Sequence, residues 1–227
     1  MLITLPQVFD AAEVRQLRDV LAQLAWQDGA ATGGSVGRTV KHNRQADATA
    51  AADAGLVDAV LRRLDETPRF TSAALPHRLY PPRFNRYGIG ETYGTHVDGS
   101  LMRLPGDGSL MRTDLSATLF LSDPAEYDGG VLEIDTRFGV QEVKLDAGDL
   151  VLYPASSLHR VTPVTRGERL ACFFWIQSVV RDHDIRATLF DLDEAIQALT
   201  RERSRTDPTL VSLIGVYHNL VRFHATP

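Results

Sequence analysis

The stretch Gly94-Thr95-His96-Val97-Asp98 decides how the rest of this 227-residue chain is interpreted. In a β-strand, successive side chains point to opposite faces, so His96 and Asp98 would share one face and Val97 would point away. A histidine and a carboxylate on the same face can both bind one metal ion. The triplet alone is weak evidence, because about one such pair is expected by chance among seven histidines and 29 acidic residues.

A second cluster, residues 158–170, strengthens the case for a metal site. It places His159 on a predicted strand and Arg169 on the next, with a Thr-Arg-Gly-Glu turn between them. In an antiparallel hairpin, two such residues can face the same cavity. Two histidines and one carboxylate on one face of a metal form the facial triad of non-haem Fe(II) oxygenases. The planar guanidinium of Arg169 suits a carboxylate.

These site residues, together with five runs of sequence, resemble the bacterial PKHD-type (prolyl/lysyl hydroxylase domain) hydroxylases, which are Fe(II)- and 2-oxoglutarate-dependent dioxygenases. The runs are 83–87, 94–98, 112–121, 147–154 and 174–178. The resemblance covers nearly the whole chain. It implies a mostly β fold, a double-stranded β-helix or jelly roll, with N-terminal helices packed on the sheet. We expect residues 1–180 to form this dioxygenase domain and residues 181–227 to form a C-terminal helical extension.

The resemblance also implies roles for single residues. His96, Asp98 and His159 would bind Fe(II), and Arg169 would bind the distal carboxylate of 2-oxoglutarate. A tyrosine on the strand before the His-x-Asp strand often contacts 2-oxoglutarate in related enzymes, so Tyr87 is a candidate, with a plain core aromatic residue as the alternative. The reaction would consume O2, convert 2-oxoglutarate to succinate and CO2, and hydroxylate a substrate. Ascorbate is a further cofactor candidate.

Two other functions fit the same ligands. Catalytic zinc also accepts two histidines and a carboxylate. The chain has no His-Glu-x-x-His motif and no obvious general base, and Arg169 would have no role in a zinc hydrolase. A non-enzymatic jelly-roll sensor would bind iron or a 2-oxo acid without turnover, and the sequence leaves this alternative open. The substrate, whether peptidyl or a small molecule, does not follow from a fold-level resemblance.

Composition limits the partners of the protein. The net charge is −5 and the basic residues are dispersed, so we predict no nucleic-acid partner. The N-terminus lacks a signal-peptide pattern, and the longest apolar run, 170–176, is too short to cross a membrane. Cys172 is the only cysteine, which fits a reducing compartment. We therefore predict a cytoplasmic protein without a membrane partner.

Helical patterns flank the predicted β region. Residues 10–26 begin with a capping box formed by Asp10 and Glu13, and residues 47–66 carry apolar side chains at helical spacing. Two more helices are predicted in the tail, one from His183 and one after Asp207, which precedes a proline. Both tail helices have strong apolar stripes, so we expect them to pack on the domain and to form a homodimer contact.

Three further segments receive provisional interpretations. The glycine-rich residues 33–37 lack the ending of a phosphate-binding loop, so we interpret them as a plain loop. Lys41, Asn43 and Gln45 alternate as in a strand. We interpret that face as solvent-exposed, with a pocket wall as the alternative. Residues 99–111 show no clear period and are interpreted as a lid or substrate-binding loop.

Overall fold

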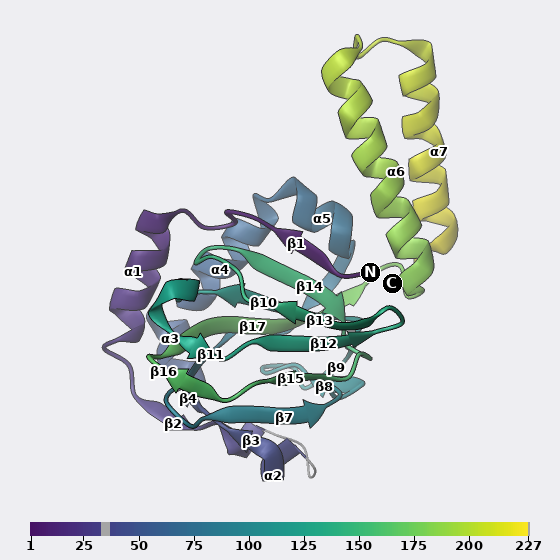
Figure 1. Ribbon diagram of the computed structural model, residues 1–227. Helices are drawn as coiled ribbons and strands as arrows, with labels where there is room; N and C mark the ends of the chain where they lie inside the picture. The colour runs from purple at the N-terminus through teal and green to yellow at the C-terminus, as the bar shows by residue number, and fades with distance from the viewer. Residues whose placement is uncertain (33–36, 227) are drawn as a thin grey trace.

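Two facing β-sheets, helices on the outer face of one sheet, and a projecting helical hairpin make up the protein (Figure 1). The structure is a computed structural model and describes residues 1–32 and 37–226, so most of the glycine-rich segment at 33–37 lies outside the described residues. The described part confirms the predicted fold class, a mostly β jelly roll with flanking helices.

The larger sheet has eight strands in the order β1-β14-β10-β17-β6-β4-β2, with β5 also paired to β17. All its pairs are antiparallel. Its strands are β1 (Ile3–Leu5), β2 (Trp26–Asp28), β4 (Arg44–Ala46), β5 (Pro76–Leu79), β6 (Arg83–Tyr87), β10 (Leu115–Phe120), β14 (Leu150–Pro154) and β17 (Arg169–Ser178).

The smaller sheet has five strands in the order β13-β12-β15-β7-β3. They are β3 (Lys41–His42), β7 (Thr92–His96), β12 (Leu132–Thr136), β13 (Gly139–Val143) and β15 (His159–Val161). Strands β12 and β13 pair as an antiparallel hairpin. Two separate two-stranded sheets pair β8 (Leu101–Arg103) with β9 (Leu110–Arg112), and β11 (Asp128–Gly129) with β16 (Val164–Arg166).

Strand alternation in the larger sheet separates a helix-facing core from an inner cavity. On β10, Leu115 and Leu119 belong to the core cluster that includes apolar residues of the N-terminal helices. The intervening Ser116 and Thr118 line the cavity between the sheets. Because successive strand side chains point to opposite faces, one strand supplies both layers. The polar residues within this otherwise apolar strand therefore indicate its cavity face.

Four N-terminal helices pack on the outer face of the larger sheet: α1 (Ala11–Leu21), α3 (Ala48–Asp53), α4 (Leu56–Asp65) and α5 (Pro68–Ala74). The short helix α2 (Gly37–Val40) contacts β7 of the smaller sheet instead, and short 3₁₀ turns occur at Gly29–Thr32 and Pro124–Glu126. Asp10 and Glu13 form the predicted capping box of α1. The helix ends earlier than predicted, because β2 pairs with β4.

One prediction about the helical region is wrong. The helix predicted at 47–66 is divided into α3 and α4 by Gly55, whose φ of 74° is a left-handed conformation that favours glycine. The next helix, α5, begins at Pro68, where a missing backbone N–H costs nothing.

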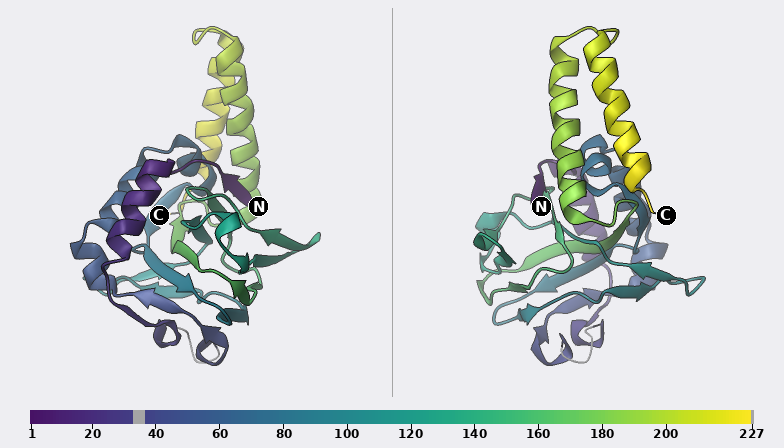
Figure 2. Two further views of the ribbon diagram at one scale, coloured as in Figure 1. Left: turned by 60° about the vertical axis from the view of Figure 1, so that its left-hand side comes forward. Right: turned by 90° about the vertical axis from the view of Figure 1, so that its right-hand side faces the viewer.

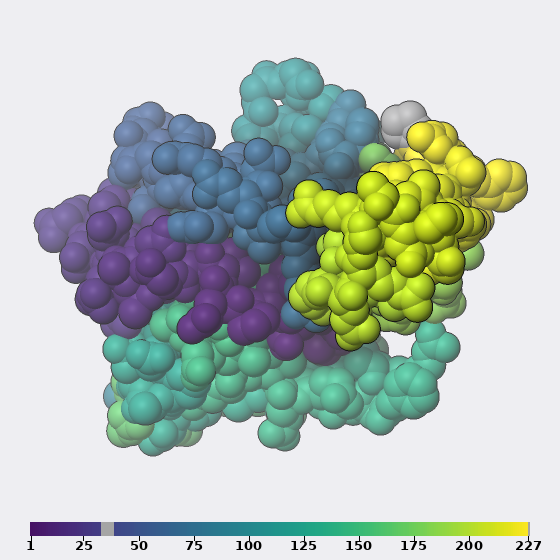
Figure 3. All heavy atoms as spheres, turned by 90° about the horizontal axis from the view of Figure 1, so that it is seen from above, coloured from purple at the N-terminus to yellow at the C-terminus, as the bar shows by residue number. Residues whose placement is uncertain are grey.

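The C-terminal helices α6 (His183–Glu202) and α7 (Pro208–His224) pack side by side and project from one end of the domain (Figures 1 and 2). Asp182 and Asp207 cap them through hydrogen bonds to backbone N–H groups, as predicted for Asp207. Seen from above, the tail stands beside the N-terminal helices (Figure 3). Arg69 of α5 forms an ion pair of 3.2 Å with Glu194 of α6. Within the described residues, no helix has both the length and the apolar character needed to cross a lipid bilayer.

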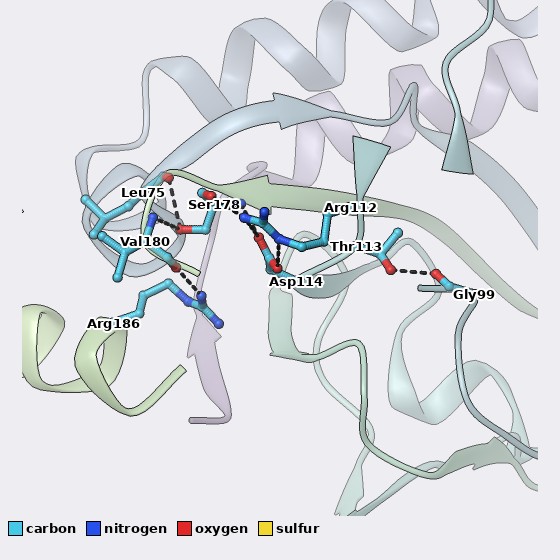
Figure 4. Close-up of polar contacts among 8 residues, drawn as sticks. All are labelled: Leu75, Gly99, Arg112, Thr113, Asp114, Ser178, Val180 and Arg186. Carbon is cyan, nitrogen blue, oxygen red and sulfur yellow. Dashed lines mark hydrogen bonds and ion pairs between the residues drawn. The ribbon is translucent and has the colours of Figure 1, made fainter. Parts of the chain in front are cut away.

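A polar cluster joins the base of the tail to the domain (Figure 4). Arg112 donates two hydrogen bonds to the Asp114 carboxylate, at 2.7 and 3.0 Å, and a third to the Ser178 carbonyl. Asp114 also accepts a hydrogen bond from the Ser178 N–H at 2.8 Å. Arg186 of α6 is buried and donates to the Val180 carbonyl at 2.7 Å. The charge-assisted hydrogen bond of Arg186 therefore ties the start of α6 to the segment that follows β17, beside a polar cluster within the domain.

Candidate active site

A cavity of about 480 Å³ lies between the two sheets. Its size is within the usual range for small-molecule sites in proteins. The cavity is lined by residues of both sheets, among them His96, Asp98, His159, Tyr87 and Arg169. Every residue predicted for the site from the sequence therefore reaches this one cavity.

His96 is the last residue of β7, and Asp98 follows beyond the end of that strand. The prediction that both residues lie within one strand is therefore wrong in its backbone geometry. Both side chains still line the cavity. The Nδ1 of His96 donates a hydrogen bond of 2.8 Å to the Gly94 carbonyl, which can only accept. This bond fixes the tautomer and leaves the Nε2 lone pair free for a metal.

His159 reaches the site through the register of the smaller sheet. It is the residue of β15 directly opposite His96 of β7, and the two rings are 4.2 Å apart. Its Nδ1 donates a hydrogen bond of 3.0 Å to the Ser157 carbonyl, so its Nε2 also has a free lone pair. The two histidines thus present the same ring nitrogen to the same space.

Asp98 completes the cluster. Its carboxylate lies 4.0 Å from Nε2 of His96 and 3.8 Å from Nε2 of His159, and one potential ligand atom from each residue falls within 4.8 Å of the others. The Ser116 hydroxyl donates a hydrogen bond of 2.5 Å to Oδ2 of Asp98 and so orients the carboxylate. Two imidazoles and one carboxylate on one side fit a facially bound Fe(II).

Burial keeps the imidazole of His96 ready for a metal. Burial, followed in size by the proximity of His159, lowers the pKa of His96 from 6.5 to about 4. A neutral imidazole, not an imidazolium, is the form that binds a metal. The ring of Tyr93 stacks on the His96 ring at 3.6 Å, with 14° between the planes. Tyr93 therefore supports the position of this ligand, a role that sequence reasoning missed.

Arg169 lies on β17 in the larger sheet, on the other side of the cavity from His159. The predicted hairpin between these residues is wrong, because β15 pairs with β12 and β7 whereas β17 pairs with β10, β6 and β5. The two side chains meet the cavity from facing sheets. Their shared location was predicted correctly, for a reason that the topology does not support.

The Arg169 side chain is only 1% exposed and has no carboxylate partner within 4 Å in the described part of the chain. Its Nε has no hydrogen-bond partner there. The guanidinium lies over the rings of Tyr87 and Phe120, at 5.5 and 5.1 Å. A buried guanidinium without an anion is costly, so it marks a binding point for an anionic ligand. Tyr87 lies directly opposite Arg169 in the pairing of β6 with β17.

The interpretation of Lys41, Asn43 and Gln45 as a solvent-exposed face is wrong. They are 5%, 3% and 4% exposed, and Lys41 lines the cavity. The composition could have singled out Lys41, because lysine is rare in this chain: it has two lysines, Lys41 and Lys144, and 22 arginines. The pocket-wall alternative therefore holds for Lys41.

Residues 99–111 are not an irregular loop. Strands β8 and β9 pair in register and are joined by a turn. Met102 of β8 lines the cavity next to the metal cluster. The hydroxyl of Thr113 donates a hydrogen bond of 2.5 Å to the Gly99 carbonyl, which fixes the base of this hairpin (Figure 4). The segment is an ordered hairpin with a side chain at the cavity, and its role as a lid or substrate-binding segment stays a prediction.

Comparison with known proteins agrees with this site. Residues 82–177 match the model of the 2OG-Fe(II) oxygenase superfamily, and residues 184–225 match the PKHD-type hydroxylase C-terminal domain. A PKHD-type hydroxylase from Acidovorax ebreus is 59% identical over 100% of both chains. One from Teredinibacter turnerae is 55% identical over 99% of both. The fold resembles a 2OG-Fe(II) oxygenase family oxidoreductase from Burkholderia pseudomallei, with a TM-score of 0.56 and 16% identity over 77% of this chain and 84% of that chain.

Proposed function

This chain belongs to the PKHD-type hydroxylases of the 2OG-Fe(II) oxygenase superfamily, and on that premise we propose that His96, Asp98 and His159 bind its Fe(II). The protein is an Fe(II)- and 2-oxoglutarate-dependent dioxygenase. Its reaction takes a substrate C–H group, O2 and 2-oxoglutarate to a C–OH group, succinate and CO2. Bound iron supplies the activation of oxygen, and the protein supplies binding, orientation and exclusion of water.

Each proposed metal ligand is oriented by a hydrogen bond to another group of the protein. Hydrogen bonds to backbone carbonyls direct Nε2 of both histidines toward the cluster, and Ser116 orients Asp98. We assign the distal carboxylate of 2-oxoglutarate to Arg169, with Tyr87 beside it as a second contact. Burial raises the pKa of Tyr87 to about 12, so its phenol stays protonated near neutral pH and can donate a hydrogen bond to a carboxylate.

One observation carries the assignment: a facial triad and a buried arginine without an anion share one cavity. A zinc hydrolase would need the three ligands but would give this arginine no task. A sensor would retain the whole arrangement. The relatives named as hydroxylases, similar over the full length of the chain, support turnover over sensing.

The function is tested by succinate formation. The purified protein with Fe(II), O2 and 2-oxoglutarate is expected to form succinate, and a cell extract is expected to gain a product heavier by one oxygen atom. The same extract treated with the Asp98→Ala protein is the control. If the parent protein consumes no 2-oxoglutarate with or without extract, the sensor alternative replaces the enzyme.

The remaining functional proposals concern location, substrate and reductant. We place the protein in the cytoplasm because its single cysteine, Cys172, is buried and unpaired. We propose a peptidyl or small-molecule substrate, since the net charge and dispersed basic residues do not favour nucleic acid. Ascorbate is proposed as a reductant that keeps the iron in its Fe(II) state. Succinate formation with and without ascorbate over repeated turnovers tests the last proposal.

We also propose that residues 1–180 form the catalytic domain and that residues 181–227 form an extension in which α7 contacts a second copy of the chain. Only one of the 17 residues of α7, Arg222, is of the Asp, Glu, Lys or Arg type. One face of the helix packs toward α6, whereas Val216, Leu220 and Phe223 are exposed at helical spacing. An uncharged face of this kind is self-complementary, and an exposed apolar patch favours association.

Light scattering tests this contact. The parent protein is expected to be a dimer at micromolar concentration, and Phe223→Glu is expected to make it monomeric, because the substitution places a charge in an apolar interface. Phe138→Glu is the matched control, since Phe138 is 86% exposed on the hairpin of β12 and β13 and Phe223 is 82% exposed. A parent protein that is monomeric at this concentration leaves the tail with a packing role alone.

A further inference from the structure

Lys41 is a buried cation in the active-site cavity without a protein anion to pair with. It lies on β3 and donates a hydrogen bond of 2.8 Å from Nζ to the Thr32 hydroxyl, which is neutral. No ion pair within 4 Å joins it to a carboxylate in the part of the chain that the structure describes. The sequence at 33–36, Gly-Gly-Ser-Val, contains no acidic residue either. A desolvated ammonium needs a counter-charge to be stable, so a ligand must supply one.

The surroundings of Lys41 favour an anion further. Burial, and then the positive charge of Arg83, lower the pKa of Lys41 from 10.5 to about 8. The more distant carboxylates of Asp98 and Asp28 offset this only in part. A protonated lysine that is disfavoured by desolvation and by a nearby positive charge is stabilised strongly when an anion binds beside it.

The position of Lys41 is distinct from that of Arg169. Its Nζ lies over the rings of Tyr93 and Phe173, at 5.2 and 5.8 Å. Phe173 and Arg169 share one face of β17 and are four residues apart, which is roughly 13 Å at the usual rise of a strand. The proposed function assigns the distal carboxylate of 2-oxoglutarate to Arg169, and this separation places Lys41 at another point of the cavity. The two cations therefore define two anion subsites in one cavity.

The charge balance of the loaded site indicates what the second subsite accepts. Lys41, Asp98 and Arg169 are the only Asp, Glu, Lys or Arg residues among the described residues that line the cavity. The tyrosines that line the cavity carry uncharged phenols near neutral pH, as tyrosine ordinarily does, so none supplies an anion. Fe(II), Arg169 and Lys41 bring four positive charges, and Asp98 and 2-oxoglutarate bring three negative ones. One positive charge remains, which a single carboxylate neutralises.

We propose that Lys41 binds a carboxylate group of the substrate, so that the molecule hydroxylated here is a carboxylic acid. This inference rests on the function proposed above. The Tyr93 ring contacts both Lys41 and His96, so a substrate anchored at Lys41 would extend along Tyr93 toward the metal ligands. Phe173 and Trp175 line the same part of the cavity and would cover the apolar body of the substrate. The carboxylate could belong to a free acid or to the C-terminus of a peptide.

The presence of only two lysines allows a direct test by NMR. Protein labelled with ¹³Cε-lysine gives two signals, and Lys144→Arg identifies them. Zn(II) and N-oxalylglycine fill the metal and 2-oxoglutarate sites without turnover. Phenylacetate is then expected to shift the Lys41 signal saturably, while its neutral amide, phenylacetamide, does not. Lys144 is the internal reference, because it lies outside the cavity and donates to the Tyr127 carbonyl.

A second measurement uses variants and reads ligand binding directly. Lys41→Met is expected to weaken phenylacetate binding, followed by saturation-transfer NMR, by roughly 10- to 100-fold, the loss typical of a hydrogen bond to a charged group. Lys41→Arg retains the charge and should keep part of the affinity. Lys144→Met is the matched control and should bind as the parent does. Acetyl-glycyl-phenylalanine against its C-terminal amide then distinguishes a peptide terminus from a free acid.

Three outcomes would overturn the proposal. Phenylacetate and phenylacetamide could shift the Lys41 signal equally, or Lys41→Met could bind phenylacetate as the parent does. N-oxalylglycine alone could shift the Lys41 signal fully, which would make Lys41 the co-substrate anchor. None of these readouts requires turnover. Succinate formation without a response at Lys41 removes this proposal alone, whereas a response without succinate formation removes the enzymatic function and leaves the anion site.

Discussion

Asp98→Ala is expected to weaken Fe(II) binding by more than roughly 100-fold. Loss of a group that only supports a metal ligand typically costs 10- to 100-fold in affinity, and loss of the ligand itself should cost more. Asp98 is also the only carboxylate of the cluster, so its removal takes away the charge that offsets part of the Fe(II) charge. Anaerobic Fe(II) titration of the purified protein measures the effect, and His159→Ala should behave similarly.

Two further variants make the experiment specific. Ser116→Ala removes only the hydrogen bond to Asp98, so it should lower Fe(II) affinity by the smaller factor of 10 to 100. His218→Ala alters an exposed histidine on α7 and should leave the affinity unchanged. If Asp98→Ala and His159→Ala bind iron as tightly as the parent, these residues are not the iron ligands.

The triad could be predicted because each of its parts leaves a local mark in the sequence. His96 and Asp98 are two residues apart, which suffices to bring both into the cavity even though the strand ends at His96. His159 was identified by its place in a strand followed by an arginine. The family resemblance then supplied the combination. Helix N-caps also depend on residues that are close in the sequence, so Asp10 and Asp207 correctly indicated where their helices begin.

The features that were missed depend on pairing between distant strands. Whether Lys41 faces solvent or a cavity is decided by its neighbours Tyr93 and Phe173, which belong to different sheets. Strand alternation identifies a face but not what covers it. The same limit explains why Arg169 was assigned to a hairpin with His159, because two strands that are consecutive in the sequence need not pair. The segment at 99–111 shows no clear period, so the sequence does not reveal its hairpin.

Substitution of Arg169, the proposed anchor of 2-oxoglutarate, is expected to have the second large effect. Arg169→Ala is expected to raise the 2-oxoglutarate concentration for half-maximal turnover by roughly 30-fold to several thousand-fold. Removing one partner of a buried, hydrogen-bonded charge pair costs about 2 to 5 kcal/mol, which corresponds to this range. The buried position of Arg169 and its lack of a protein anion place it in this class. Succinate formation against 2-oxoglutarate concentration, with saturating Fe(II), is the measurement.

Measuring Fe(II) affinity distinguishes a specific loss of 2-oxoglutarate binding from a general disruption of the active site. Arg169 lies on the sheet opposite the two histidines and contributes no ligand, so Arg169→Ala should bind Fe(II) nearly as the parent does. Arg169→Lys should recover only part of the 2-oxoglutarate affinity, because an ammonium offers a point charge in place of a planar, two-pronged donor. Arg160→Ala is the matched control, since Arg160 is exposed and pairs with Glu133. An Arg169→Ala enzyme with an unchanged 2-oxoglutarate requirement would move the anchor to another cation, and Lys41 is the only other Lys or Arg that lines the cavity in the described part of the chain.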